Sequence, residues 1–361
     1  MRGRGRGFGS WNAPDHERAS WNDSGTRAVR ERGNDSVTRA VRERYPSGTR
    51  TRGDPVAEHD LAPHELRVVV AVEQARSFSG AARDLGLTQS AVSHSVRGTE
   101  KKLGAVLFER GRRGAVPTPA GERAVAHARR VLRLLETLAA ETRAAAAAEA
   151  AGGGPCAPDG GTVAGPLRIA AFRSAALHLL PPALAALRAR HPGIEPEVRV
   201  VRELGRGTAG EVADGRADIG IATIGTSSPI PRGLVGGVLV EEPYSFVHPA
   251  GHPAPRTLPL VDWAENCTSY TRDWWAGQDW IPRATTRTED DGAVLAMVSA
   301  GHAMAIMPAL SLTGAPPSVA VVDLGPARPT RSVGYVTTSE QAGSQVVRAL
   351  IRELRALRAQ P

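Results

Sequence analysis

The residues best suited to contact another molecule gather on one side of the segment between residues 88 and 101. They share hydroxyl, amide, imidazole or cationic side chains at helical spacing: Thr88, Gln89, Ser90, Ser93, His94, Arg97 and Lys101. Side chains of these kinds reach base edges and phosphates when a helix lies in the major groove of DNA. Taken alone, such a stripe is also typical of an ordinary solvated helix face.

The neighbouring residues favour a DNA-reading helix. Val92, Val96 and Leu103 would form its apolar underside, and Thr88 would cap its start. A shorter helix, capped by Ser79 and ended by Gly86, precedes it. Two helices joined by a tight, glycine-containing turn predict a helix-turn-helix.

Three arginines follow in a short hairpin. Residues 106–108 are expected to form a strand, and Arg110, Arg112 and Arg113 lie at the tip that follows it. A cationic tip beside a reading helix is typical of a wing that holds backbone phosphates, which supplies affinity but reads no sequence. The alternative is a hairpin whose charge serves solubility alone. A first helix over residues 64–74 would complete this domain.

A long helix is expected over residues 118–151. Thr118 would cap it, and its apolar residues recur at alternating steps of three and four: Val125, Ala128, Leu132, Leu135 and Ala139. This pattern predicts a seam covered by a second copy of the chain, and packing of the helix on its own chain is the alternative. Residues 152–165, GGGPCAPDGGTVAG, form a flexible linker by composition.

Strands and helices alternate beyond the linker. Strands are expected at 167–172, 197–203 and 217–223, with helices at 177–190 and 208–215 between them. This order predicts a parallel sheet with helices on its faces, so the fold class is α/β. A second lobe is expected over about 225–331, and RSVGYVTT would return the chain to the first lobe, about 166–224 and 332–361. The last helix would carry Thr338 and Gln341 as a capping box.

The segment Ala71–Glu122 resembles the winged helix-turn-helix of the LysR-type transcriptional regulators. The resemblance rests on the order SFS, AA, L, TQSAVS, E, LG and LFER, although Ser90 stands where the family commonly has proline and His94 where it commonly has arginine. It implies a winged helix-turn-helix DNA-binding domain over 61–121, a dimerising helix and a two-lobed effector domain over 166–361, similar to periplasmic binding proteins. The implied partners are double-stranded DNA, a small-molecule effector and further copies of the chain, as a homodimer or homotetramer, with no cofactor.

The resemblance also implies an effector crevice between the lobes, at the ends of strands and near helix starts. By position its lining would come from both lobes: Ser174, Thr208, Thr223, Tyr270, Thr271, Arg272, Trp275, Gly301 and His302. Trp274 and Trp275 belong to an aromatic-rich stretch that either stacks on a flat effector or packs as core. Arg173 or Arg272 would pair with a carboxylate on such a ligand.

One motif suggests another class of protein. Gly205, Gly207 and Gly210 form a G-x-G-x-x-G between a strand and a helix, the context of a dinucleotide-binding loop. No acid follows near Gly225 to hold a ribose, so a helix start in an effector crevice is the simpler interpretation. A nucleotide-dependent enzyme and an architectural DNA-binding protein with an inert sensor are the alternatives.

The charge of the chain is concentrated in its DNA-binding part. Of a net charge of +8, residues 65–143 contribute 14 Lys and Arg against 8 Asp and Glu, whereas from residue 144 on the counts are 19 and 20. Such asymmetry favours a polyanionic partner for one domain only. Two cysteines, Cys156 and Cys267, predict no disulfide framework or metal site. With no apolar run of a membrane span or signal peptide, the sequence predicts a cytoplasmic protein without a membrane partner.

The first 60 residues have the composition of a disordered extension. They are rich in Arg, Gly, Ser and Asn, lack an apolar period, and repeat TRAVRER at 26–32 and 38–44. The Arg-Gly start would suit a nucleic-acid-binding arm. A translation start near Val56 is the other interpretation.

Overall fold

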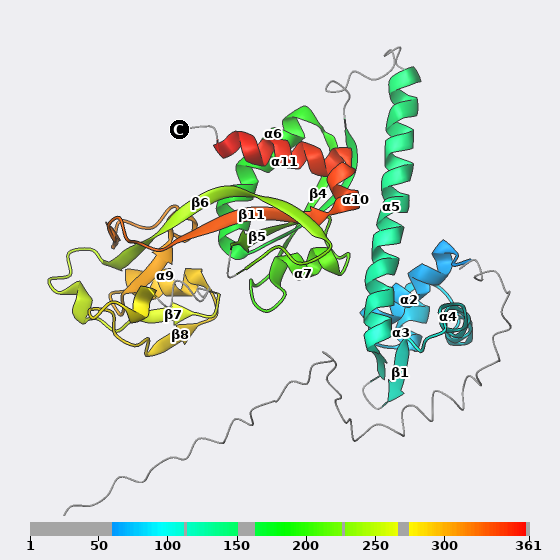
Figure 1. The fold of residues 1–361 in the computed structure, drawn as a ribbon, viewed down its shortest axis with the longest axis horizontal. Helices are drawn as coiled ribbons and strands as arrows, with labels where there is room; N and C mark the ends of the chain where they lie inside the picture. Colours follow the sequence, from blue (N-terminus) through cyan, green and yellow to red (C-terminus); the bar gives the residue numbers. More distant parts are fainter. Residues whose placement is uncertain (1–59, 112–113, 151–162, 226–227, 266–273, 359–361) are drawn as a thin grey trace, which may run out of the picture. The chain divides into compact units, whose positions relative to one another are not determined.

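The computed structural model describes residues 60–111, 114–150, 163–225, 228–265 and 274–358 (Figure 1). The expectations for residues 1–59 and for most of the linker lie outside these described residues. Within them, a winged helical region is followed by one long helix and then by an α/β region.

The winged region consists of three helices and a two-stranded hairpin. Its elements are α2 (Pro63–Ala75), α3 (Phe78–Asp84), α4 (Gln89–Leu103), β1 (Phe108–Gly111) and β2 (Gly114–Pro117). Its core gathers valines of α2 and α4 around Leu107, each at most 1% exposed: Val69, Val72, Val92 and Val96. The predicted helix-turn-helix is therefore confirmed.

Two local predictions in this region are wrong by one or two residues. The cap of α3 is Ser77, whose hydroxyl accepts a hydrogen bond from the Gly80 amide at 3.0 Å, and Ser79 only bonds the Ser77 hydroxyl. Starting the helix two residues earlier buries Phe78 against the core, which outweighs the choice of cap. The first strand begins at Phe108 instead of residue 106, because its pairing partner β2 reaches only to Pro117.

The long helix α5 (Pro119–Ala150) begins as predicted, with the Thr118 hydroxyl accepting from the Gly121 amide at 3.0 Å. Its first turns pack on α2: Val125 and Ala128 are 2% and 3% exposed, and Arg129 forms an ion pair with Glu73. For this half of the helix, the alternative of packing on the same chain is the correct one. Leu134, Leu135 and Leu138 further along are exposed.

The first lobe of the α/β region is built on a parallel core. Its elements are β3 (Ala164–Ala171), α6 (Leu180–Arg190), β4 (Gly193–Val200), α7 (Gly207–Ala213) and β5 (Ile219–Ile224), with a π turn at Ala175–Leu179 before α6. Strand β3 lies between β4 and β5 and is parallel to both, as the βαβαβ order predicts. The π turn shortens the predicted helix, which starts at Leu180 and not at Leu177.

Two long strands connect the lobes. Strands β6 (Leu234–Pro249) and β11 (Thr330–Thr338) pair antiparallel, and β11 also pairs with β5 of the first lobe. Toward its other end β6 pairs with β9 (Ala305–Pro308) and β10 (Val319–Asp323) of the second lobe. The two strands therefore carry one curved sheet through both lobes, as Figure 1 shows.

The second lobe adds a small parallel pair and a helix. Its further elements are two short 3-10 turns, Pro255–Thr257 and Ala309–Leu312, with β7 (Val261–Trp263), β8 (Thr286–Thr288) and α9 (Asp291–Ser299). The predicted helix of this lobe is confirmed, with Asp290 as its cap, accepting from the Ala293 amide at 2.9 Å.

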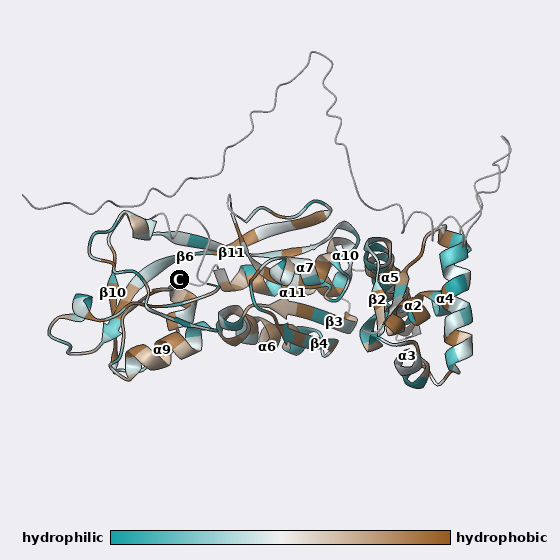
Figure 2. Ribbon diagram, turned by 90° about the horizontal axis from the view of Figure 1, so that it is seen from below, coloured by the Kyte–Doolittle hydropathy of each residue, from teal (hydrophilic) through white to brown (hydrophobic). Residues whose placement is uncertain are grey.

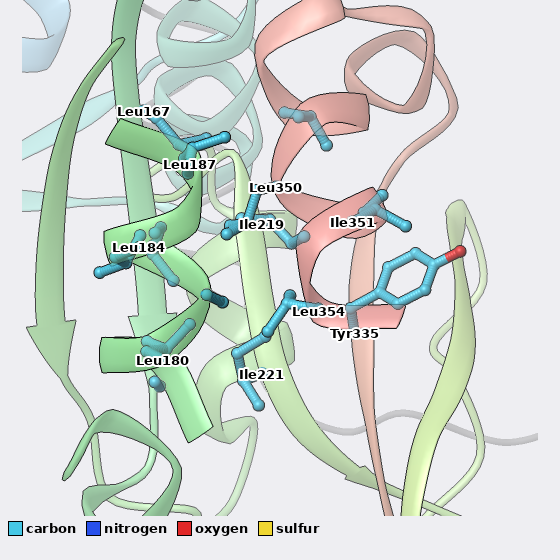
Figure 3. Packing of buried hydrophobic residues seen from close by; sticks show 14 of the residues in the cluster. Leu167, Leu180, Leu184, Leu187, Ile219, Ile221, Tyr335, Leu350, Ile351 and Leu354 are labelled. Carbon is cyan, nitrogen blue, oxygen red and sulfur yellow. The ribbon is translucent and has the colours of Figure 1, made fainter. Parts of the chain in front are cut away.

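The chain ends in two helices where one was predicted. They are α10 (Ser339–Gly343), capped by Thr338, and α11 (Gln345–Arg358). The apolar face of α11 packs with α6 over the sheet, where Leu350, Leu354 and Leu187 are at most 1% exposed (Figure 3). This core holds the first lobe together and positions the ends of its strands that face the second lobe.

Candidate functional site

Glycines and a capping threonine define where α4 begins and ends. Gly86 takes a φ of +64°, which favours glycine, and the Thr88 hydroxyl accepts from the Ala91 amide at 3.2 Å. Gly104, with φ of +66°, ends the helix. Figure 2 shows α4 hydrophilic along much of its length, while α2 is largely hydrophobic.

The structure leaves most of the predicted reading residues exposed on α4. The exposed ones are Thr88, Gln89, Ser90, His94, Arg97 and Lys101. Ser93 is the exception, because it is 6% exposed and lies on the side that carries Val92 and Val96. Its placement on the groove-facing stripe therefore needs correction: the buried face of α4 is wide enough to include it. The Ser90 hydroxyl lies 3.0 Å from that of Thr88 and so belongs partly to the cap.

The wing is anchored to the helices by backbone contacts. The Ala115 amide donates to the Arg76 carbonyl at 2.9 Å, and a β-carbon at Gly114 would lie 2.3 Å from that oxygen. Only glycine fits there, and its φ is +87°. Arg110 lies in β1, opposite Ala115. The Arg110 side chain and all of Arg112 and Arg113 lie outside what the structure describes.

Glu100 is a positioning residue that the sequence analysis missed. Its side chain is buried near the end of α4, and one carboxylate oxygen accepts from the Leu107 amide at 2.8 Å and from the Phe108 amide at 3.4 Å. These bonds hold the start of β1 against the reading helix. An acid inside the buried stripe of α4, one turn before Gly104, was the signal for it.

The second half of α5 exposes an apolar stripe. Its members lie three or four residues apart along one side of the helix: Val131 and Leu134, then Leu135 and Leu138, at 43%, 41%, 36% and 63% exposed. The stripe includes Leu135 of the predicted seam, whereas Val125 and Ala128 of that seam pack on α2. An uncovered apolar stripe of this length favours a partner helix.

Two of the predicted crevice residues of the first lobe, Thr208 and Thr223, contact an unpredicted carboxylate, that of Glu203. Ser174 and Thr208 are 3% and 0% exposed, and Thr223 is half-buried near the end of β5. The Glu203 carboxylate accepts from the Thr208 amide at 3.0 Å and from the Thr223 amide at 3.2 Å. Burial raises the pKa of the Glu203 carboxyl, and these two hydrogen bonds oppose that rise without cancelling it.

The Glu203 carboxylate also lies close against the glycine-rich loop at Gly207. Gly207 has a φ of +46°, and a β-carbon there would lie 2.7 Å from a Glu203 carboxylate oxygen. The carboxylate thus occupies the Thr208 amide at the start of α7, which a phosphate would need. This arrangement disfavours the dinucleotide interpretation of the motif.

Arginine–carboxylate pairs bridge the two lobes. Arg173 of the first lobe lies 2.8 Å from Asp291 at the start of α9, and the Ser311 hydroxyl donates to the same carboxylate at 2.6 Å. On the other side Arg202 lies 3.3 Å from Glu265. Burial raises the pKa of the Glu265 carboxyl.

A further pair lies where the connecting strands pass between the lobes. The Arg331 Nε atom donates to Glu242 at 2.6 Å, and the guanidinium carbon lies 5.0 Å from the centre of the Phe172 ring. Both charged side chains are at most 8% exposed. Two charges in adjacent apolar strands were the sequence signal for this pair, which the sequence analysis also missed.

Trp263, Trp275 and Trp280 of the second lobe pack with buried clusters. Trp275 and Trp280 contact a buried cluster around Phe246 and Ile306, and the Arg256 guanidinium lies 4.4 Å above the Trp280 ring. The Trp275 indole nitrogen is buried without a hydrogen-bond partner among the described residues. Tyr270, Thr271 and Arg272 lie outside the described ranges.

Gly301 and His302 lie apart from the inter-lobe pairs. Both are exposed at the C-terminal end of α9, whereas Asp291, which contacts the first lobe, begins that helix. Helix α9 has nine residues, which places its two ends about 13 Å apart. Within the described ranges, no cluster of three or more His, Cys, Asp or Glu is arranged to hold a metal ion. Nor is any helix there long and apolar enough to cross a membrane.

Comparison with known protein families gives two matches. Residues 63–122 match the model described as "Bacterial regulatory helix-turn-helix protein, lysR family". Residues 160–359 match the model described as "LysR substrate binding domain".

Comparisons with individual proteins agree with these family matches. The chain is 33% identical over 273 residues to the probable HTH-type transcriptional regulator LrrA of Synechococcus elongatus, covering 72% of this chain and 85% of that protein. The structure is similar to CbnR complexed with its target DNA, with a TM-score of 0.56, 20% identity and coverage of 82% and 99%. It is also similar to Corynebacterium glutamicum LysG with bound effector Arg, with a TM-score of 0.57, 18% identity and coverage of 83% and 99%.

Proposed function

The chain belongs to the LysR family of transcriptional regulators, and from this premise we propose how its own residues bind DNA and answer to a ligand. Members of this family are regulators and not enzymes, and they join a helix-turn-helix to an effector-binding domain. The observation that carries the proposal is α4, whose inner face is buried while its outer face presents hydroxyl, amide, imidazole and cationic groups.

In this proposal α4 lies in the major groove. Gln89, Ser90, His94 and Arg97 face base edges, and Lys101 reaches the flanking phosphate backbone. Ser93 is left out because it is buried. Arg110, Arg112 and Arg113 hold phosphates from the wing, whose attachment through Gly114 and Glu100 keeps it at the side of α4.

The exposed stripe of α5 pairs two copies of the chain. Two reading helices would then meet successive faces of a roughly palindromic site, and pairs of dimers would form a tetramer. Each chain would cover the leucines of the other, which removes the apolar surface that α5 exposes alone.

A small effector binds between the lobes of the C-terminal domain. Ser174, Thr208 and Thr223 would line the first-lobe side, joined by Tyr270, Thr271, Arg272 and Trp275 from the second lobe, with Gly301 and His302 more distant. The effector acts only if it binds one arrangement of the lobes more tightly than another. The inter-lobe pairs Arg173–Asp291 and Arg202–Glu265 support this, since they are contacts that a change of lobe angle would make or break. The natural setting of such a regulator is the cytoplasm, where its DNA is.

The test compares two arginines with different roles. Arg97→Ala should weaken binding to the operator by about 1–3 kcal/mol and bind random DNA almost as before. Arg112→Ala should weaken both DNAs similarly and flatten the dependence on salt. Footprinting of the region upstream of the gene would supply the operator, and Arg188→Ala, on an exposed position of α6, is the matched control. Equal losses on operator and random DNA for Arg97→Ala would refute its assigned role.

A further inference from the structure

The two halves of α4 are held to the rest of the winged region in different ways. In the first half, Val92 and Val96 are at most 1% exposed and pack in the apolar core. In the second half the buried positions are polar, since Thr99 is 1% exposed and Glu100 8%, while Leu103 is only half-buried. The Thr99 hydroxyl donates to a carbonyl of α4 itself at 3.0 Å, so this bond stays within the helix. Apolar burial therefore anchors α4 mainly through its first half.

Lys102 supplies a second attachment, near the end of α4. Its Nζ atom donates to both carboxylate oxygens of Glu65 in α2, at 2.9 and 2.8 Å, and to the Asp60 carbonyl oxygen at 2.6 Å. An ammonium group has three N–H donors, so these three acceptors use all of them. In this arrangement Lys102 has no donor left for a DNA phosphate.

Glu65 holds the other end of this attachment. Its side chain is 10% exposed, and the same carboxylate accepts from the Ala62 amide at the start of α2 at 2.9 Å. Burial by itself would raise the pKa of the Glu65 carboxyl, but the hydrogen bonds from Lys102 and Ala62 and the charge of Lys102 lower it below the ordinary value. The carboxylate also lies beside α4 at Gly98, where a β-carbon would be 3.9 Å from one of its oxygens. Glu65 is therefore charged at neutral pH and fixed against the second half of α4.

Arg97 lies some distance from the apolar anchor of α4. From Val92 to Arg97 the helix advances about 7.5 Å, so a tilt of about 10° would move Arg97 by roughly 1.3 Å. A shift of that size breaks a hydrogen bond to a base edge, because the length of such a bond varies by only a few tenths of an ångström. A phosphate contact tolerates it better, since the attraction between charges falls off slowly with distance. The angle of α4 therefore affects discrimination between sequences more than general affinity for DNA.

We propose that Lys102 is a positioning residue that does not contact DNA. Together with Glu65 it holds α4 at the angle from which Arg97 reads bases. Because Glu65 neutralises Lys102, the pair adds specificity and no net charge. This inference rests on the proposed function, since it takes α4 as the helix that lies in the major groove.

The main test is the double variant Glu65→Gln/Lys102→Met of the full-length chain. It keeps the net charge of the protein, leaves neither partner of the pair as an uncompensated charge, and keeps a side-chain oxygen that accepts from the Ala62 amide. Fluorescence anisotropy measures the affinities for the footprinted operator and for random DNA, below a thermal midpoint determined by circular dichroism. Random DNA should be bound as by the wild type, and the ratio of the two affinities should fall at least fivefold.

Two single variants are matched controls. Lys102→Arg keeps a cation that can bind the Glu65 carboxylate, so its ratio should stay within twofold of the wild-type value. Lys101→Met removes the same charge one residue earlier, from a side chain assigned to the phosphate backbone. It should weaken operator and random DNA alike and leave the ratio unchanged.

A thermodynamic cycle with Arg97→Ala separates positioning from a purely structural role. If Lys102 acts through Arg97, the double variant should lower the ratio less than twofold in the Arg97→Ala background. A general loss of folded protein would act equally in both backgrounds. An unchanged ratio in the double variant, or an equal fall of the ratio in both backgrounds, would overturn the proposal. A wild-type protein that prefers no duplex would instead contradict the proposed function.

Discussion

Replacing Glu242 by glutamine removes one charge from the buried pair between the lobes. The carboxylate accepts from Arg331 Nε at 2.6 Å and, through its other oxygen, from the Leu310 amide at 2.5 Å. Burial lowers the pKa of the Arg331 guanidinium, but the charge and hydrogen bond of Glu242, together with Tyr244 and Asp291, raise it above its ordinary value, so the arginine stays charged. Without Glu242 the guanidinium would be a buried cation with no counter-charge in contact.

The structure sets the size of the expected loss. The exposed fractions are 8% for Arg331 and 3% for Glu242, so water screens the pair little. Breaking such a pair by removing one partner costs about 3–5 kcal/mol. Glutamine keeps one carbonyl oxygen as an acceptor, so we expect a loss of about 3 kcal/mol in the free energy of unfolding of the effector domain. The double variant Glu242→Gln/Arg331→Met should regain most of it, since no charge is then buried.

Urea unfolding followed by tryptophan fluorescence measures this loss. Four of the six tryptophans lie between Trp263 and Trp280, so the signal reports chiefly on the second lobe. With a slope of about 2 kcal/mol per molar urea, the midpoint should fall by roughly 1.5 M. A loss below about 1 kcal/mol for Glu242→Gln, or a double variant no more stable than the single one, would refute the reasoning.

Three more predictions concern the helix seam, a carboxylate and a glycine. Leu138→Glu should raise the dimer dissociation constant at least a hundredfold in analytical ultracentrifugation, because a covered leucine contributes about 1.5–3 kcal/mol and the glutamates of the two copies would repel each other. The control Leu138→Met should stay dimeric. A dimeric Leu138→Glu would disprove the seam. The pKa of the Glu203 carboxyl is raised, so its stabilising contribution is full below the ordinary value of 4.5 and is lost as pH rises through the folded-state pKa. The unfolding free energy of the wild type minus that of Glu203→Gln should therefore fall between pH 4 and 7. A difference that does not change with pH would contradict this. Gly121→Ala should lower the thermal midpoint of the winged region by several degrees, because its β-carbon would lie 1.9 Å from the Leu107 carbonyl oxygen, and an unchanged midpoint would contradict that close approach.

Local signals predicted the elements well. Gly86 and Thr88 mark the turn and the start of α4, and Asp290 marks the start of α9, because a cap or a positive φ depends on a few neighbouring residues. The order of apolar segments likewise predicted the parallel core of the first lobe and the return of β11. Ser77 was missed as a cap because Phe78 is drawn into the core by residues distant in sequence.

Contacts between segments distant in the chain could not be predicted from the sequence. Glu100 reaches the wing, and Glu203 reaches two amides that lie 5 and 20 residues further along the chain. Nothing in a local pattern distinguishes such an acid from a solvated one. For a related reason the predicted seam of α5 includes residues that pack within the chain, since the pattern shows that Val125 is apolar but not that α2 covers it.

The most direct test of the central claim asks whether α4 gives the protein a preference among DNA sequences. Full-length protein is mixed with fragments of its own genome at physiological ionic strength, with excess bulk competitor, and the bound fragments are sequenced. The account predicts that at least one duplex, with two related half-sites about one helical turn apart, is bound at least a thousandfold more tightly than the competitor, and that Arg97→Ala loses most of this ratio. Equal retention of all fragments by the wild-type protein would contradict it.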